Sequence, residues 1–528
     1  MDVRLSGSSF VVGLIEGPDP AGGNDEVDAA VDLLRELRRR LSHTELKLVL
    51  GTGSSRAIGE AAASLGIEIE APGGPGLSAD ALIHRSSLLL ALWDGLPSDA
   101  GGDTADIVTR FLRVHGTATL ADPTDLHSRH DPADGSEHVV LWVPTPRGRA
   151  DRASLPAAGY LVAAGEEAIE LHASMPEALQ HLLAELDEFN LEFQRFTRAG
   201  HRSNSQSLLL DLPEGLGEGD AAALRSIDRQ FLKADTLAGH MQWRSDRLFN
   251  LFGVMAFSMG LAYLIYDKIV ESRVLLIVYL LILFGSMLAY YWLNQQRWLG
   301  KHLSYRALAE TLRVKFYLAL AHLDGRMMVS ELIALAGVHR FRGFGLIGLV
   351  LGGLESTAPA GPAQGLEATA HRGQFIERAW VEAQFQYFTR KVAQMELGTL
   401  RVKRMKTLMF AAVLVDIVAM FTFGDALHKA GTITGLPIKN IMTFCSGFLA
   451  ALLGVWELRQ NKMATRELLW QYRNQLRQFA RTRARLRHVK NPRSRDTLLM
   501  KLGANSLMET YLWAIHRYHR EHAPPGAY

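Results

Sequence analysis

The sequence predicts an α/β domain at the N-terminus, followed by an all-α helical membrane domain with four transmembrane helices. Strand-like and helix-like stretches alternate over residues 10–172, and four long apolar runs follow in the C-terminal two-thirds of the 528-residue chain. Residues 1–220 hold 17 Lys+Arg against 35 Asp+Glu, whereas residues 221–528 hold 40 against 20. A basic half can bind nucleic acid, but bases beside apolar runs favour a membrane. We therefore expect a lipid bilayer as a partner and no nucleic acid.

The N-terminal half alternates predicted strands and helices. Apolar, β-rich stretches that end in turn residues predict strands at 9–17, 46–51, 86–95, 138–144 and 160–165. Helical spacing of apolar residues predicts helices at 27–41, 55–66 and 104–116, the second of which ends in a cap at Gly66. Strands that alternate with helices are typical of a parallel sheet with helices on both faces.

A long amphipathic helix is expected after the last strand. Ser174 and Glu177 have the spacing of a capping box, with Pro176 between them. One apolar stripe then follows the helix, formed by Leu179, Leu182, Leu183, Leu186, Phe189, Phe193 and Phe196. Residues 201–220 are polar and glycine-rich, which predicts a linker.

The apolar runs are long enough to cross a membrane. Residues 248–266, 274–296 and 440–456 contain no charged residue, and 407–424 contain only Asp416. A bilayer core needs about 20 apolar residues in a helix, so the runs predict two helical hairpins. For the first two runs, a buried helix pair in a large soluble domain is the alternative. The run at 344–353 is too short to span, and we expect it at the surface or inside a bundle.

Flanking charges predict the orientation of the hairpins. Basic residues lie before the first and third runs and after the second and fourth, whereas loops 267–273 and 425–439 are nearly neutral. The positive-inside rule then places the hairpin tips outside and both the N- and C-termini in the cytoplasm. The bases that precede the first run are Lys233, Arg244 and Arg247.

The compartment is predicted from three further observations. No signal peptide is visible, because the first apolar stretch, 10–15, is too short for one. The single cysteine, Cys445, permits no internal disulfide, as expected in a reducing cytoplasm. With the four predicted spans, these features indicate a multi-pass protein of the inner (cytoplasmic) membrane.

The two predicted hairpins resemble an internal repeat. Each is entered by a helix rich in aromatic and charged residues, at 241–247 and 384–391. Each is left by a long helix, at 304–323 and 467–487, and we expect these helices to form a cytoplasmic stalk. The basic face of 467–487 fits anionic lipid headgroups better than nucleic acid, because the helix follows a membrane span.

Two glycine-rich turns between a strand and a helix carry the candidate ligand chemistry. One spans residues 51–56 (GTGSSR), and the other joins 93–95 (WDG) to 101–106 (GGDTAD). Backbone N–H groups and the helix dipole can hold phosphate at such turns, beyond the carboxyl ends of parallel strands. The alternative is that these glycines only form tight turns. The candidate ligand-binding residues are Gly13, Gly17, Gly51, Thr52, Gly53, Ser54, Ser55, Arg56, Arg85, Asp94, Gly95, Gly101, Gly102, Asp103, Thr104 and Asp106.

No catalytic or metal-binding motif is found in the sequence. It contains no Gly-x-Ser-x-Gly, no P-loop lysine and no His-Glu-x-x-His, and its 19 histidines are scattered. Asp103 and Asp106 fit a helix N-cap better than an acid–base couple. We therefore expect neither a metal nor a set of catalytic residues.

Asp416 is the functional candidate within the membrane. A carboxylate that faces lipid is costly, so Asp416 is expected to face a bundle interior or a water-filled path. Three roles are open: a pore or gate residue, a packing hydrogen bond to Thr443 or Ser446, or part of a shallow interfacial helix.

Residues 85–95 (RSSLLLALWDG) and 101–108 (GGDTADIV) resemble the signature of SLOG domains. That Rossmann-like superfamily includes the LOG hydrolases that activate cytokinins, the DprA-type DNA-processing proteins and the sensor domain of melastatin-type channels. The resemblance implies a pocket for a nucleotide or a nucleotide-derived signal. The LOG loop reads Pro-Gly-Gly-x-Gly-Thr-x-x-Glu. Here Asp103 precedes Thr104, and Ile107 or Val108 holds the Glu position, which weighs against hydrolysis.

The C-terminal half resembles SLATT modules, which are transmembrane-pair effectors found with such sensors in bacterial conflict systems. The matching stretches are 233–238, 305–313 and 502–509, followed by Trp513, His516 and Arg517. The implied organisation is a SLOG-like domain at 1–200, a linker at 201–220, a first SLATT-like hairpin unit at 221–325, a connecting segment at 326–370 and a second SLATT-like unit at 371–528.

These expectations combine into a membrane-embedded effector. A cytoplasmic sensor of a nucleotide-type ligand would control a four-helix bundle in a homo-oligomer, by pore formation or membrane perturbation. The resemblance implies a role in bacterial conflict or antiphage defence. The alternatives are a membrane-anchored nucleotide or nucleoside hydrolase of LOG type, and a membrane scaffold whose α/β domain binds no ligand.

Overall fold

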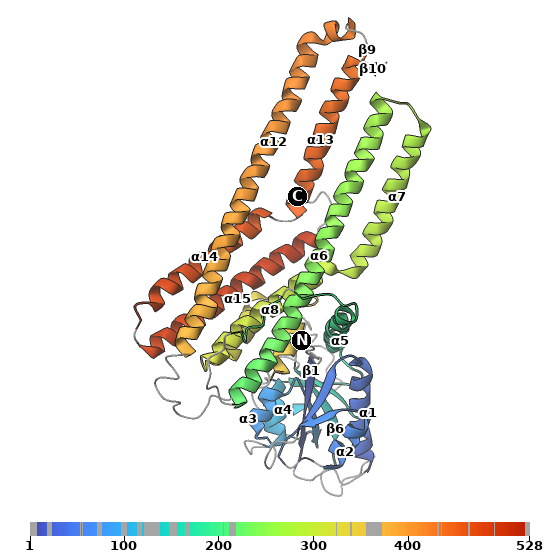
Figure 1. Ribbon diagram of the computed structural model, residues 1–528. Coiled ribbons are helices and arrows are strands. Elements are labelled where there is room, and N and C mark those ends of the chain that lie inside the picture. The colour runs from blue at the N-terminus through green and yellow to red at the C-terminus, as the bar shows by residue number, and fades with distance from the viewer. Residues whose placement is uncertain are drawn as a thin grey trace. The chain divides into compact units, whose positions relative to one another are not determined.

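The computed structural model divides the chain into two compact units (Figure 1). The α/β unit comprises Met1–Leu237, Ser304–Gly373 and Thr510–Ile515, and the membrane unit comprises Ala238–Leu303, Gln374–Glu509 and His516–Tyr528. The structure describes residues 8–17, 24–52, 54, 56–70, 77–96, 103–112, 119–120, 138–146, 156–163, 168–203, 205–210, 218–323, 325–337, 341–354, 372–429, 432–433, 436–462, 465–489 and 491–522.

Within the described residues, the α/β unit contains an eight-stranded sheet of order β3-β2-β1-β4-β6-β7-β8-β5. The strands β3, β2, β1, β4 and β6 are parallel neighbours, and the sequence predicted four of them as apolar stretches. The strands are β1 (Ser9–Glu16), β2 (Glu45–Leu50), β3 (Glu68–Glu70), β4 (Leu88–Trp93), β5 (Thr119–Leu120), β6 (Val139–Pro144), β7 (Gly159–Ala163) and β8 (Ala168–His172).

Helices cover both faces of the parallel strands, which explains why β4 and residues 10–15 of β1 are apolar. On one face, Val11 and Ile15 pack with α3 (Ala79–Arg85) and α4 (Thr104–Leu112). The other face contacts α1 (Asn24–Arg40) and α2 (Arg56–Ser64). The three helices predicted at 27–41, 55–66 and 104–116 are α1, α2 and α4, although residues 113–116 lie outside the described part. Gly66 has the positive φ of +72° expected of a helix C-cap.

The sheet is mixed rather than wholly parallel, which corrects the sequence prediction. β7 pairs antiparallel with both β6 and β8. For β7 and β8 the reason is the short connection, since β7 ends at Ala163 and β8 begins at Ala168, whereas a parallel crossover needs about a dozen residues. β8 has no apolar run that would have marked it as a strand.

The amphipathic helix is α5 (Glu177–Arg198), but its predicted capping box is wrong. The N-cap is Pro176, held in an extended conformation, and no side chain caps the helix, so Ser174 lies outside it. The apolar stripe is confirmed, since its buried members are Leu179, Leu183, Leu186, Phe189, Phe193 and Phe196.

Three helices that follow the first two membrane spans lie wholly or mostly in the α/β unit: α8 (Trp298–Leu320), α9 (Arg326–Ala336) and α10 (Leu346–Gly352). The Tyr305 ring of α8 lies 5.1 Å from that of Phe189, so this part of the helix expected in the stalk packs against α5. The short run 344–353 forms α10, which is buried against α5 and β1. α10 is therefore part of the α/β unit. The expectation that this run lies at the surface or inside a helical bundle was wrong.

The membrane unit holds four helices that are long and apolar enough to cross a membrane, at the four predicted runs. They are α6 (Glu218–Lys268), α7 (Arg273–Gln296), α12 (Ala383–Lys429) and α13 (Ile438–Lys462). At most 6% of each apolar window is buried. Exposed apolar surface of this extent is typical of a membrane protein.

Contacts link the four helices in the order α7, α6, α13, α12. Tyr263 of α6 lies 6.2 Å from Tyr279 of α7, between ring centroids. Phe257 of α6 lies 5.4 Å from Phe448 of α13. On the other side, Lys406 of α12 forms an ion pair with Glu457 of α13. The first 20 residues of α6 belong to the α/β unit, so this single helix takes part in both units.

The last two helices are α14 (Thr465–Leu486) and α15 (Pro492–His522). α14 packs along the part of α12 that precedes its apolar run and along the π-helical turn before it, η4 (Glu377–Glu382). The ion pairs are Arg473–Glu396 at 2.6 Å and Arg483–Glu382 at 2.5 Å. Arg483 also lies over the Phe385 ring, at 4.6 Å, as Arg313 of α8 lies over Phe231 of α6, at 5.0 Å. The helix that leaves each membrane pair thus contacts the helix that enters it in the same way.

Candidate functional site

The candidate site lies at the carboxyl ends of β1, β2 and β4. β1 is the point where the strand order reverses, because β2 is its neighbour on one side and β4 on the other. In open α/β sheets ligands bind outside the carboxyl ends of the strands at such a point. The turns proposed from the sequence follow β2 and β4, so both lie at this edge.

The first turn of α4 lies directly at the end of β1. Thr104 donates its hydroxyl to the Glu16 carbonyl at 3.0 Å, and Gly17 donates its N–H to the Leu92 carbonyl at 2.9 Å. The Asp106 N–H donates to the Asp103 carboxylate at 2.9 Å, so Asp103 caps α4. The positive end of the helix dipole faces this edge, where it favours a negatively charged or hydrogen-bond-accepting group.

The described part of the edge presents carboxylates rather than cations. Glu16 ends β1, Asp94 follows β4 and Asp103 caps α4. Arg85, a candidate phosphate partner, forms an ion pair with Glu70 at 2.5 Å. Carboxylates accept hydrogen bonds from hydroxyl groups, so this edge suits a ligand that carries sugar hydroxyls. Phosphate would be held by backbone N–H groups.

The glycines of the site have different structural reasons. A Cβ at Gly13, in the middle of β1, would overlap Ser86, and one at Gly51 would lie 2.9 Å from the Leu14 carbonyl oxygen. Packing therefore accounts for both positions. Gly95 has a φ of +77°, which a turn requires. Gly17 is different, because a Cβ there would meet only the Leu92 oxygen at an ordinary 3.6 Å.

The turn after β2 is held against β1. Gly51 donates its N–H to the Leu14 carbonyl at 2.8 Å, and the Ser54 hydroxyl donates to the same oxygen at 3.0 Å. Thr52 is exposed. The side chain of Arg56 lies outside the described residues, as do the remaining candidates, Gly53, Ser55, Gly101 and Gly102.

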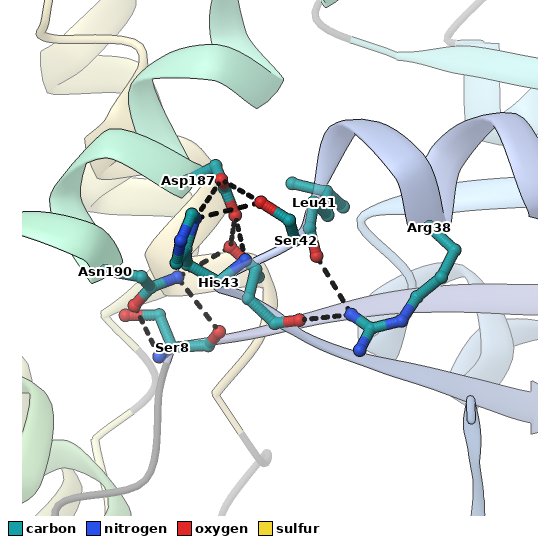
Figure 2. Close-up of polar contacts among 8 residues, drawn as sticks. Ser8, Arg38, Leu41, Ser42, His43, Asp187 and Asn190 are labelled. Carbon is teal, nitrogen blue, oxygen red and sulfur yellow. Dashed lines mark hydrogen bonds and ion pairs between the residues drawn. The ribbon is translucent and has the colours of Figure 1, made fainter. Parts of the chain in front are cut away.

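A second polar cluster lies at the opposite edge of the sheet, beside the amino ends of β1 and β2 (Figure 2). It includes Ser42, His43 and Asp187, residue types that form hydrolytic triads. Here the Ser42 hydroxyl, at 2.9 Å, and the Asp187 carboxylate, at 2.8 Å, both contact the same atom, His43 Nδ1. A triad needs one ring nitrogen for each partner, so this cluster is not one. Asp187 also accepts the His43 N–H at 2.7 Å, which fastens α5 to the loop before β2.

The cluster continues through buried groups to α6. Asn190 accepts from the Ser8 N–H at 2.8 Å and from the Lys233 ammonium group, and it donates to Thr44 at 2.7 Å. Lys233 also donates to the Ser8 hydroxyl at 3.1 Å and lies 4.4 Å from the centre of the Phe189 ring. These contacts join β1, α5 and α6 into one network. Figure 2 shows Ser8 beside Asn190.

Lys233 is only 1% exposed, although the sequence placed it among the bases that flank the first membrane run. It lies in the α/β unit, outside the apolar run 248–266. Burial lowers the pKa of Lys233 to about 7, against the opposing effect of the Glu45 carboxylate. Sequence reasoning missed this network. Its one signal is Asn190, a polar residue on the apolar stripe of α5 between Leu186 and Phe193.

Asp416 lies in the contact between α12 and α13. The Ser446 hydroxyl of α13 donates to the Asp416 carboxylate. Thr443, the other partner considered, donates to the Lys439 carbonyl at 2.8 Å and contacts Met420. The half-buried positions of α12 recur at Met409, Val413, Asp416 and Met420, the spacing of a helix–helix seam.

The fold is that of a membrane protein with a Rossmann-like α/β unit and four apolar helices. Among the residues that the structure describes, no three His, Cys, Asp or Glu side chains are grouped so that they could hold a metal ion. No protein-family model, curated protein or solved structure matches the chain.

Proposed function

We propose that the protein is a membrane-embedded effector in which a nucleotide-type ligand, bound at the carboxyl edge of the sheet, controls the four-helix transmembrane bundle. The observation that carries this proposal is the continuity of α6. One unbroken helix of 51 residues contains both Lys233, buried in the α/β unit, and the first apolar run. A change in how the α/β unit holds α6 would therefore act on a membrane span.

The proposed route of coupling is strand β1. Its carboxyl end carries Gly17 and contacts Thr104 at the candidate site, and its amino end follows Ser8, which contacts Lys233. The strand has eight residues and a length of about 26 Å. A buried strand moves as a rigid element, so a ligand that displaces the carboxyl end of β1 also displaces its amino end. The ligand controls the bundle only if it binds one arrangement of α6 better than the other.

The proposed output is at the bundle, where Asp416 is the only charged residue within the four apolar runs. A seam that holds a carboxylate and a hydroxyl can hydrate when the helices shift, which fits either an ion path or a local perturbation of the bilayer. The resemblance to SLOG and SLATT modules supports the same combination of sensor and effector. It also supports assembly as a homo-oligomer and a role in bacterial conflict.

The full-length protein in nanodiscs, given a panel of nucleotides and nucleotide-derived signals, tests the proposal. Binding without turnover is expected. Turnover of a bound nucleotide would instead indicate the membrane-anchored hydrolase. An absence of binding across the panel would indicate the scaffold. The Gly17→Leu variant is the control, because its side chain would fill the space at the end of β1 where the ligand is expected.

A further inference from the structure

The base of the α6–α7 pair carries a cluster of arginine and tryptophan side chains, here called the Arg–Trp cluster: Trp243, Arg244, Arg247, Trp292 and Trp298. The Arg244 guanidinium carbon lies 5.3 Å from the centre of the Trp298 ring, and that of Arg247 lies 5.2 Å from the Trp243 ring. Trp292 packs edge-to-face on Trp298, at 6.1 Å. Trp243 and Trp292 are each 55% exposed, so the cluster forms a surface.

The cluster lies at the depth of lipid headgroups. Arg244 and Arg247 precede the start of the apolar run at Leu248 by four residues and by one, or about 6 Å and 1.5 Å along the helix. Trp298 follows the end of the second run, at Gln296, by two residues. Between the hydrocarbon core and bulk water, the headgroup region is about 5–8 Å thick on each side of a bilayer. Trp292 lies four residues inside the second run, and the other members of the cluster begin where the hydrocarbon ends.

The stacking leaves the binding edge of each guanidinium available to a phosphate. A guanidinium that stacks on an aromatic ring uses its face, whereas its N–H donors lie in its plane and match a phosphate bidentately. Tryptophan is the residue that prefers this layer of the bilayer. The positions of Arg244 and Arg247 are thereby fixed by rings that themselves anchor in the interface.

The arginines of α14 provide the contrast. Arg473 and Arg483 form ion pairs with Glu396 and Glu382, which precede the apolar run of α12 at Thr407. Measured along α12, these carboxylates lie about 16 Å and 37 Å from the start of that run. Both distances exceed the headgroup layer, and the second is several Debye lengths of about 8 Å. The Arg–Trp cluster is therefore better placed to contact lipid headgroups than the helix at 467–487, for which that contact was expected.

We propose that the Arg–Trp cluster is a binding site for the phosphate of an anionic phospholipid headgroup. The proposal is independent of the ligand site in the α/β unit, because it rests on residues of the membrane unit alone. It predicts that the protein selects phosphatidylglycerol over phosphatidylcholine, whose phosphate charge is balanced by its own choline.

Native mass spectrometry of the full-length protein from bicelles of equal parts phosphatidylglycerol and phosphatidylcholine tests the site. Wild type should retain phosphatidylglycerol selectively. The Arg244→Gln/Arg247→Gln variant should lose this preference by roughly thirtyfold, the effect of two charges near an anionic surface. The matched control is Arg477→Gln/Arg481→Gln, which removes two exposed arginines of α14 and should leave the preference unchanged.

Three outcomes would overturn the proposal. The first is an equal preference for phosphatidylglycerol in wild type and in Arg244→Gln/Arg247→Gln. The second is a loss of that preference in Arg477→Gln/Arg481→Gln as large as in the cluster variant. The third is displacement of the lipid by inorganic phosphate, which would assign the site to a soluble phosphate. Arg247 is exposed, so Arg247→Gln alone serves if the double variant does not assemble, with about a fivefold loss expected.

Discussion

Replacing Lys233 by Met tests whether a buried amine holds α6 to the α/β unit. The hydrogen-bond partners of Lys233, Ser8 and Asn190, are neutral, and burial lowers its pKa from 10.5 to about 7. Below about pH 7 the amine is protonated in both the folded and the unfolded chain, and the cost of burying its charge is fully present. Between pH 7 and 10.5 only the unfolded chain binds the proton, so the free energy of unfolding rises with pH.

The size of the effect follows from that window. Each unit of pKa difference is worth about 1.4 kcal/mol, so Lys233 adds about 2 kcal/mol to the free energy of unfolding between pH 7 and pH 9. Met has a similar length and no proton to lose. The difference in stability between wild type and Lys233→Met should therefore move by about 2 kcal/mol in favour of wild type as pH rises from 7 to 9.

Urea unfolding of the full-length protein in nanodiscs, followed by near-ultraviolet circular dichroism, measures this difference. Gln230→Met is the matched control, because Gln230 accepts from the Ser8 hydroxyl at 2.7 Å in the same network but has no ionisable group. It should keep the pH dependence of wild type. Parallel profiles for wild type and Lys233→Met, or a difference that moves the other way, would refute the account of Lys233.

Three further predictions concern topology, the ligand site and the bundle. Reporter fusions at residue 270 and at residue 432 should both read as external, and a cytoplasmic signal at 432 would remove the second pair of spans. Gly17→Ala should fold normally and weaken nucleotide binding. Gly51→Ala should lower thermal stability, because its Cβ would lie 2.9 Å from a carbonyl oxygen. Unchanged binding in Gly17→Ala would mean that no ligand approaches β1. Asp416→Asn should keep assembly and change ion flux if Asp416 lines a path, while Asp416→Leu should lower stability; equal flux in wild type, Asn and Leu proteins of equal abundance would rule out that role.

The elements that the sequence predicted are those that can be recognised from the apolar residues of their own segment. β4 and residues 10–15 of β1 are apolar because both faces of these strands are covered, and the four long runs carry no charge except Asp416, as a membrane span requires. The elements that were missed depend on distant parts of the chain. β8 carries the alternating pattern of a half-exposed strand, and α10 is recognisable as a layer of the α/β unit only once α5 and β1 are placed beside it.

The candidate site stays a prediction, and the sequence could assign the edge of the sheet at which its turns lie but not the contacts of its residues. The Gly-rich turns could be assigned to the carboxyl edge because parallel strands end together there. Sequence alone cannot separate Gly17, where a side chain has room, from Gly13 and Gly51, where packing excludes one. The ion pair of Arg85 with Glu70 and the burial of Lys233 likewise depend on contacts between separate elements. Such pairings leave no periodic trace in the chain.

Ligand-dependent ion flux from liposomes tests the central claim most directly. The full-length protein is reconstituted, and the nucleotide that binds best is added on the side that exposes the α/β unit. If the ligand controls the bundle, ion flux should rise with ligand concentration in the same way as binding does. The Gly17→Leu variant should lose both binding and flux. Saturable binding with no change in flux, and no leakage of a larger dye, would contradict it.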